Sequence, residues 1–283
     1  MAGSDVGRDA RRRRGSRRAA VKRILASLLE FVRLTGEQVE LFVQVLLRLH
    51  HTWKRRALIG DQLYVGGIKV LHVVLLVSFS MGMVVSLQTG IELSRIGQQD
   101  QIGLIVAVSM AREMGPFITA TILAAAVGSA LAAELGTMAV SEELSALEVL
   151  SVDRTSYLVL PRLFALAVLC PTLTVLGDTV GIVGGGLVAR SQLGVGLELY
   201  FDSAIDALQT PGVLIPIPKD VYIGLLKSFV FGIVIAIVSC SAGMRTSGGA
   251  LGVGNATRAA VRDSIILVII LNYFMTWAFY QQN

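Results

Sequence analysis

The sequence predicts an all-α integral membrane protein. Of its 283 residues, 54% are hydrophobic and only 16% are charged. An ordinary soluble domain has a more balanced share of polar residues, so this composition excludes that class. The chain has 29 glycines and only 6% aromatic residues. This balance favours helices that pack closely in lipid, where small residues let backbones approach.

The N-terminal segment is strongly basic. The first 56 residues hold 14 Lys and Arg side chains against 5 Asp and Glu, so the remainder of the chain is net acidic. Residues 1–20, with Arg11 to Arg14, Arg17 and Arg18, are predicted to form a disordered cytoplasmic tail that attracts phosphate groups. A secretory or twin-arginine signal is disfavoured because no uninterrupted apolar core and no small-residue cleavage site follow.

Residues 21–56 are predicted to form an amphipathic helix that lies in the membrane interface. Apolar residues recur at mostly three- and four-residue steps from Ile24 to Leu49, with polar side chains such as Glu37 and Gln44 between them. A soluble helical domain is the alternative. It is disfavoured because no second soluble helix is present to pair with this one.

Residues 57–283 are predicted to form the transmembrane domain, with five spans. A span needs about 20 residues, and the candidates are 68–87, 102–133, 157–189, 222–243 and 264–280. The second and third are long enough to tilt, project or break, and Gly115-Pro116 is a candidate break. The third span could instead be two short helices that turn near Pro171 or near the glycines at 184–186.

Basic residues predict the orientation. Basic residues gather in three places that alternate consistently with five crossings. They are the N-terminal tail, Arg154 and Arg162 before the third span, and Arg245, Arg258 and Arg262 between the last two spans. By the positive-inside rule they lie in the cytoplasm. Residues 192–219 then lie outside, as a short amphipathic helix followed by an extended segment, and the C-terminus also lies outside.

Two stripes of small residues predict close helix packing within the bundle. Each repeats at four-residue steps and forms a flat surface for another helix. They are Gly177, Gly181 and Gly185 in the third span, and Ala124, Gly128 and Ala132 in the second.

Three charged residues are predicted to lie inside the membrane: Arg112, Glu113 and Lys227. A charge in hydrocarbon costs about 2.5 to 3.5 kcal/mol on insertion scales, so such residues usually pair and usually mark a pathway. Neighbours on a helix point about 100° apart, so Arg112 and Glu113 need not pair, and Glu113 could pair with Lys227. Snorkelling of the Arg112-Glu113 pair from the outer end of an overlong helix is the alternative.

An acidic island at residues 134–153 separates the second and third spans. It is long enough for one surface helix, and it carries carboxylates where an inward loop is usually basic. Ser141 is the expected N-cap, with Glu142 and Glu143 in the first turn and Leu144, Leu147 and Leu150 on one face. The island predicts a coupling helix that docks on a cytoplasmic ATPase, and a solvated loop helix is the alternative. The predicted coupling residues are Glu134, Ser141, Glu142, Glu143, Leu144, Leu147 and Glu148.

No motif in the chain indicates catalysis or metal binding. The glycine-rich segment at 247–257 lacks the GK[ST] ending of a phosphate loop, and no Walker, HExxH or GxSxG motif occurs. Cys170 and Cys240 lie in apolar segments and are expected to pack as small hydrophobic residues. We therefore expect no catalytic residue, no metal site and no cofactor in this chain.

Several stretches of the chain resemble the MlaE-type permeases of lipid-transport ABC systems. They are DQLYVGGIK (61–69), MGMVVSLQ (81–88), AREMGPFITA (111–120), VGSALAAELGTMAVSEELSALEVLSVD (127–153), YLVLPR (157–162), GLLKSFVFG (224–232) and SGGALGVGNAT (247–257). They occur in family order from about residue 57 to the end of the chain, and the ELGTM…SEELSALE block is highly specific.

The resemblance implies a homodimeric permease in the bacterial inner membrane, with its N-terminus in the cytoplasm and its C-terminus in the periplasm. It implies two cytoplasmic ATPases, which bind ATP and Mg²⁺, and an MCE-domain lipid carrier on the outer face. The expected function is movement of phospholipid between the membrane and that carrier. A secondary transporter or channel and a scaffold that anchors the MCE protein are the alternatives.

The resemblance also implies an outward-opening lipid cavity at the dimer interface. Its expected wall is Leu75, Phe79, Met83 and Leu87, which share a face of the first span, with Tyr273, Met275 and Trp277 near the end of the last. Arg112, Glu113 and Lys227 match the family's intramembrane charges. The chain departs from the pattern at Asn272, where the family often has an acid, and at Ala126, where it often has Arg. Loss of both is expected to preserve the local charge balance.

Overall fold

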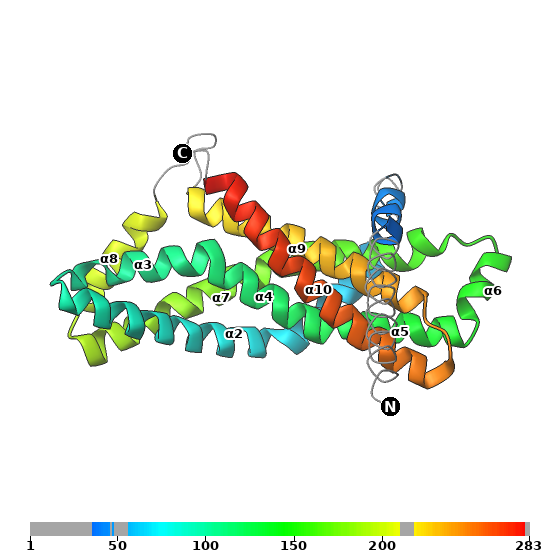
Figure 1. The fold of residues 1–283 in the computed structure, drawn as a ribbon, viewed down its shortest axis with the longest axis horizontal. Helices are drawn as coiled ribbons and strands as arrows, with labels where there is room; N and C mark the ends of the chain where they lie inside the picture. Colours follow the sequence, from blue (N-terminus) through cyan, green and yellow to red (C-terminus); the bar gives the residue numbers. More distant parts are fainter. Residues whose placement is uncertain (1–35, 46, 48–55, 210–217, 281–283) are drawn as a thin grey trace, which may run out of the picture.

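The computed structural model describes residues 36–45, 47, 56–209 and 218–280 of the chain. Every regular element in these ranges is a helix, which confirms the predicted all-α class. Five helical stretches in them are long and apolar enough to cross a membrane, which confirms the predicted number of spans. In Figure 1 they lie side by side as an elongated bundle.

The first four spans extend beyond the predicted apolar cores at both ends, and the last extends beyond its core only at the start. The first is α2 (Arg56–Arg95). The second begins with the 3-10 turn η2 (Gln99–Gln101) and continues through α3 (Ile102–Ser109), the π-helical turn η3 (Met110–Met114), α4 (Gly115–Leu123), the π-helical turn η4 (Ala124–Gly128) and α5 (Ser129–Val140). The third is the π-helical turn η5 (Thr155–Val159) with α7 (Leu160–Leu193), and the last two are α9 (Lys219–Met244) and α10 (Gly249–Tyr280). The glycine-rich segment at 247–257 is thus mostly the start of α10.

The predicted break at Gly115-Pro116 is wrong, because η3 continues directly into α4. Proline lacks an N–H, and its ring clashes with the carbonyl four residues earlier in an α-helix. The π-helical turn lies immediately before Pro116, and Gly115 donates its N–H to Met110, five residues back. The wider turn gives the proline ring room. The alternative of two short helices in the third span is also wrong, since α7 runs unbroken through Pro171.

The predicted glycine stripe of the third span meets α2. A Cβ atom added to Gly82 of α2 would lie 1.8 Å from the carbonyl oxygen of Gly181. One added to Gly177 would lie 2.7 Å from Oγ of Ser78. The two backbones therefore touch, and only glycine fits at Gly82. The stripe of the second span meets α9, because Gly128 lies against Ile235 and Ser239.

Two short helices lie at opposite ends of the bundle (Figure 1). At one end is α6 (Glu143–Val149), and at the other is α8 (Leu197–Leu208), the amphipathic helix predicted within 192–219. The hydroxyl of Tyr200 on α8 donates to the carbonyl of Ile182 at 3.0 Å, and burial raises the pKa of Tyr200. In Figure 1, α3 and α8 extend past the adjacent ends of α9 and α10. We refer below to the α6 end and the α8 end.

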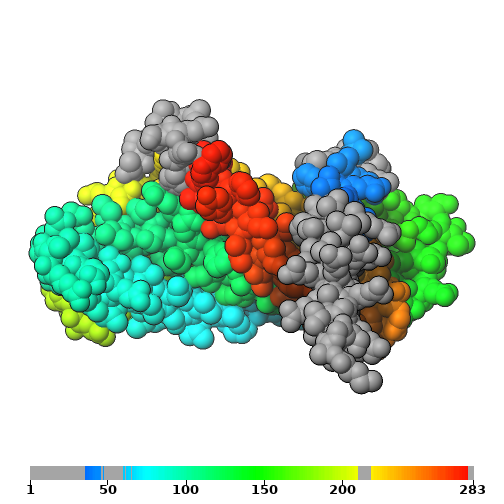
Figure 2. Space-filling view, viewed as in Figure 1, coloured from blue at the N-terminus to red at the C-terminus, as the bar shows by residue number. Residues whose placement is uncertain are grey.

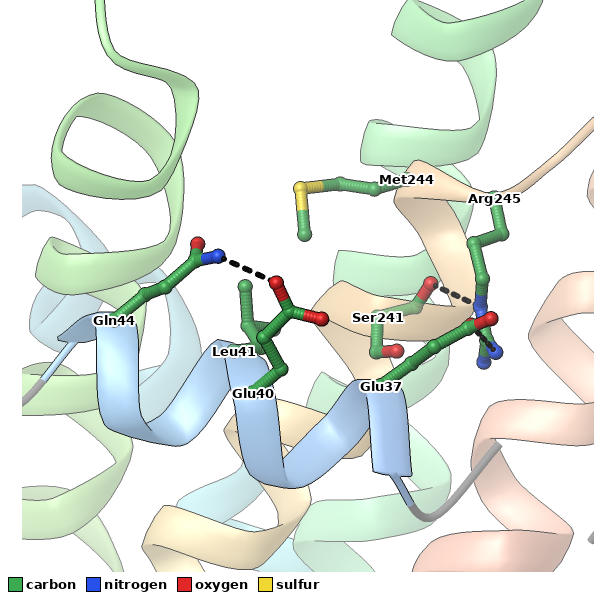
Figure 3. A pocket seen from close by; sticks show the side chains of 7 residues that line it. All are labelled: Glu37, Glu40, Leu41, Gln44, Ser241, Met244 and Arg245. Carbon is green, nitrogen blue, oxygen red and sulfur yellow. Dashed lines mark hydrogen bonds and ion pairs between the residues drawn. The ribbon is translucent and has the colours of Figure 1, made fainter. Parts of the chain in front are cut away.

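The described part of the predicted interfacial helix, residues 36–45, is helical and packs on the α6 end of α9. Leu41 and Val45 are buried, whereas Val39 is exposed. Glu37 pairs with Arg245 at 2.6 Å beside a cavity of about 220 Å³ (Figure 3). The predicted basic tail at 1–20 and the rest of the 21–56 segment lie outside the described residues.

Candidate functional site

A polar cluster lies inside the bundle, between η3, α9 and α10. At its centre is Lys227 of α9, whose side chain is completely buried. Its Nζ atom lies 2.6 Å from Oε1 of Glu113 and donates to Oγ1 of Thr276 at 2.7 Å. The pairing of Glu113 with Lys227, one of the alternatives drawn from the sequence, is therefore what the structure shows.

Glu113 is held by α10 as well as by α9. Its Oε2 atom accepts a hydrogen bond from Nδ2 of Asn272 at 3.0 Å, and its Oε1 atom lies 2.9 Å from the hydroxyl of Thr276. The carboxylate retains 29% exposure, while its lysine partner has none. The cluster thus has one positive and one negative charge, and Glu113 is the member that reaches its surface.

The backbone of η3 supplies a further hydrogen-bond acceptor to Lys227. Its Nζ atom donates to the carbonyl oxygen of Arg112 at 3.2 Å. In an α-helix the N–H of residue 116 would bond to that carbonyl, but proline has none to give. Pro116 therefore leaves an acceptor that the lysine uses. Single π-helical turns of this kind often occur at functional sites.

A glycine on α9 lets Lys227 come close to Glu113 on η3. A Cβ atom added to Gly224 would lie 2.0 Å from the carbonyl oxygen of Ala111 on η3. Gly224 precedes Lys227 by three residues, so the two share a face of α9. Close contact of the backbones at Gly224 brings the ammonium group to Glu113.

The side chain of Arg112 is not part of the Lys227 cluster, although its carbonyl oxygen is. Its guanidinium binds Oδ1 of Asp220, the second residue of α9, through Nε at 2.9 Å and Nη2 at 2.8 Å. As the sequence allowed, the side chains of Arg112 and Glu113 bind different partners rather than each other. Asp220 was not predicted as a partner, because nothing local in the sequence relates residues 112 and 220.

The two departures from the family pattern are not a local exchange of charge. Asn272 bonds to Glu113, whereas Ala126 lies in η4, thirteen residues further along the same span. At 1.5 Å per residue this is about 20 Å. The expectation that the two losses compensate locally is therefore wrong, and the amide of Asn272 serves as a neutral donor to Glu113.

The predicted coupling segment forms a short helix at the α6 end, but it begins later than predicted. Ser141 ends α5, since its N–H bonds to the carbonyl of Thr137 at 2.9 Å. Glu142 has φ 61° and makes the turn, so α6 begins at Glu143. The expected N-cap role of Ser141 is wrong because α5 continues further than the apolar pattern does.

The exposed face of α6 is acidic. Glu142, Glu143 and Glu148 are exposed, and Glu148 pairs with Arg154. Leu144 is buried and Leu147 is half-buried, as the predicted apolar face requires. Leu150 is 71% exposed because α6 ends at Val149, so its place on that face was predicted wrongly.

Glu134 does not belong to α6. It lies on α5 and connects the second span to the third. From α5, Oε1 of Glu134 accepts a hydrogen bond from Nη2 of Arg162 on α7 at 2.7 Å. The arginine side chain is 6% exposed and also donates to the carbonyl of Leu158 at 2.8 Å. The ion pair lines a cavity of about 210 Å³.

The residues predicted for the lipid cavity fall into two groups. Leu75, Phe79, Met83 and Leu87 are all half-buried and share one face of α2, where Phe79 lies against Gly184 of α7. On α10, Tyr273 and Trp277 are exposed, whereas Met275 packs against the core. Neither of the two cavities named above includes any of these residues.

One acid within a span is not among the residues predicted from the sequence. Asp178 lies in the middle of α7, and its Oδ1 atom is buried without a hydrogen-bond partner in the described part of the chain. The signal was present, because any ionisable residue within a span is a candidate site. The glycine-rich stripe around Asp178 was interpreted for packing alone.

Known proteins resemble most of this chain. A family model for the permease MlaE matches residues 59–278. A probable ABC transporter permease protein of Rickettsia bellii is 39% identical over 225 residues, which cover 80% of this chain and 84% of that protein. One of Synechocystis sp. is 37% identical over 221 residues, with coverage of 78% and 81%. The chloroplastic protein Trigalactosyldiacylglycerol 1 of Arabidopsis thaliana is 39% identical over 221 residues, with coverage of 78% and 61%.

Proposed function

This chain belongs to the MlaE permease family, and we propose that it moves phospholipid between the inner membrane and a periplasmic MCE carrier. It is a multi-pass membrane protein and a permease subunit. In our proposal it acts as a homodimer, and a separate ATPase subunit powers it. The observation that carries the proposal is α6, an exposed acidic helix between the second and third spans.

The chemistry of α6 supports docking on an ATPase. Leu144 anchors one face to the bundle, while Glu142 and Glu143 stand exposed at its start. The anionic lipids of the cytoplasmic leaflet repel carboxylates on an inward loop, whereas a basic groove on a partner would attract them. We place the α6 end in the cytoplasm, with the N-terminus, because Arg154 and Arg245 lie at that end of their helices. The C-terminus is then periplasmic.

The proposed partner would supply the chemistry of ATP hydrolysis. No Walker motif occurs in this sequence, so we assign ATP and Mg²⁺ to the ATPase and give this chain no catalytic residue. Closure of two ATPases around ATP would push on α6. The Glu134–Arg162 bond joins α5 to α7 on the two sides of α6. A push on α6 would therefore move the second and third spans together.

The proposed second copy lies against α10. Only 17% of this span's apolar core is buried within the chain, against 72% for the third span. Figure 2 shows α10 on the surface of the molecule. Tyr273 and Trp277 are among its exposed side chains. Two such faces, with the Leu75-to-Leu87 face of α2, would enclose the lipid cavity.

The lipid substrate is proposed from chemistry and from one relative. The Arabidopsis relative carries the name of trigalactosyldiacylglycerol, a glycolipid. The proposed wall is apolar, and each buried CH₂ of an acyl chain contributes about 0.8 kcal/mol without any hydrogen bond. The intramembrane charges Glu113 and Lys227 already satisfy each other. We therefore expect recognition by shape and apolar area, with loose headgroup selectivity.

The test is to purify the complex that assembles on this chain in its native membrane and to measure two quantities. The first is ATPase activity with and without added phospholipid, and the second is co-purifying lipid, measured by mass spectrometry. Bound phospholipid with lipid-stimulated hydrolysis supports the proposal. Lipid movement that is independent of ATP would instead indicate a secondary transporter or channel. Absence of both lipid and stimulation would indicate a scaffold for the MCE protein.

A further inference from the structure

Asp178 places a carboxyl group inside the third span, against the backbone of the second. A Cβ atom added to Gly115 of α4 would lie 1.7 Å from Oδ1 of Asp178. The carboxyl therefore packs directly on the Cα atom of Gly115, and only glycine leaves room for it. The side chain as a whole is half-buried, but this oxygen is shielded and has no hydrogen-bond partner in the described residues.

The helices around Asp178 supply no cation to it. Helix α4 contains no charged residue, and α2 contains none between His72 and Glu92. The cationic side chains of η3 and α9 pair with other acids. Arg112 binds Asp220, and Lys227 binds Glu113. On α7 itself, Arg162 binds Glu134, and Arg190 lies three turns further along.

An ionised carboxylate in such a place is strongly disfavoured. Its Oδ1 atom would carry part of the charge in the middle of a span, without hydration and without a hydrogen-bond partner in the described residues. A protonated carboxyl avoids that cost and gains an O–H donor. Two buried hydroxyls without partners lie on the same helices: Ser78 of α2, which lies against Gly177, and Thr119 of α4, one turn beyond Gly115.

We propose that Asp178 is a proton-binding site of this protein. The carboxyl binds a proton while α4 and α7 are packed as in this structure, and it releases the proton when they separate and water reaches Oδ1. Gly115 directly follows η3, the turn that holds Arg112 and Glu113. Any displacement of η3 relative to α7 therefore changes the burial of Asp178. The inference does not depend on the identity of the transported substrate.

Infrared spectroscopy of the full chain in lipid nanodiscs tests this directly, because a protonated carboxyl has a carbonyl band that a carboxylate lacks. At neutral pH we expect that band in the wild type, its shift on ¹³C-labelling of aspartate, and its loss in Asp178→Asn. The matched control is Glu113→Gln, which removes an acid of the neighbouring span and should leave the band in place.

The proposal is overturned if the neutral-pH spectrum contains no carboxylic-acid band that moves with aspartate labelling. It is equally overturned if Asp178→Asn removes only carboxylate bands. The labelling measurement uses the wild-type chain, so it can refute the proposal even if Asp178→Asn fails to assemble. Asparagine has the shape of a neutral carboxyl, so we expect that variant to insert and assemble as the wild type does.

Discussion

The ammonium group of Lys227 lies 2.6 Å from the carboxylate of Glu113, and no part of the lysine side chain is exposed. The two residues are 114 positions apart and belong to different spans. Their contact depends on the π-helical turn before Pro116 and on the glycine at position 224.

Removal of one partner from the Lys227–Glu113 pair should destabilise the protein more than removal of both. Lys227→Met leaves the carboxylate unpaired, and Glu113→Gln leaves the buried ammonium unpaired. Loss of one partner of a buried pair costs about 3 to 5 kcal/mol. We expect the double variant to recover part of this loss, as measured by thermal unfolding in detergent. Strictly additive losses would show that the pair contributes no coupling energy.

Asn272→Asp should weaken the cluster. The amide of Asn272 donates to Glu113 at 3.0 Å, and a carboxylate there would replace a donor with a second negative charge. We expect a lower unfolding temperature than for Asn272→Leu, which loses one hydrogen bond, worth about 1 kcal/mol. An Asp variant as stable as the wild type would mean that Lys227 can neutralise two carboxylates.

Gly82→Ala should separate α2 from α7. The new methyl group would lie 1.8 Å from the carbonyl oxygen of Gly181, and backbone cannot move aside as a side chain can. Overpacking of this kind costs about 1 to 3 kcal/mol. The control is Gly66→Ala on the same helix, where the nearest atom is a leucine methyl at 3.4 Å. That change should be neutral or stabilising, since alanine favours helices. Equal effects of the two changes on unfolding temperature would contradict the packing argument.

Glu142→Lys combined with Glu143→Lys should uncouple ATP hydrolysis from lipid movement. Glu142, in the turn before α6, and Glu143, at its start, are both exposed, so the change reverses the charge of the proposed docking face without disturbing the core. We expect normal insertion and lost lipid stimulation of the ATPase. Glu198→Lys, in the first turn of α8 at the opposite end, is the control and should behave as the wild type. Normal transport by the double variant would refute the coupling role of α6.

Met83→Asp should abolish lipid co-purification and leave the dimer assembled. Met83 is half-buried on the proposed cavity face, where a carboxylate would disfavour acyl chains. Leu76→Asp is the comparison, because Leu76 is 67% exposed on another face of the same helix and is expected to meet the bilayer. There the charge should impair insertion instead. Normal lipid recovery from Met83→Asp would show that this face of α2 does not line a lipid cavity.

The sequence by itself determined the class of this protein and its five spans. Membrane helices satisfy their backbone hydrogen bonds within one segment, so hydropathy along the chain is enough to find them. The same local reasoning found the stripe at Gly177 and the acidic helix α6. It placed Ser141 wrongly, because the end of α5 is set by a backbone turn at Glu142 rather than by the apolar pattern.

Only the tertiary structure decided which polar groups meet. Arg112 and Glu113 are neighbours in sequence, yet one binds Asp220 and the other binds Lys227 and α10. These choices depend on how closely α9 approaches η3, which a glycine on one helix and a π-helical turn on the other allow together. Oδ1 of Asp178 has no hydrogen-bond partner among the described residues, because α4 and α2 bring it only apolar and hydroxyl groups. Hydropathy is a property of each segment alone, whereas the pairing of charges is a property of the packed bundle.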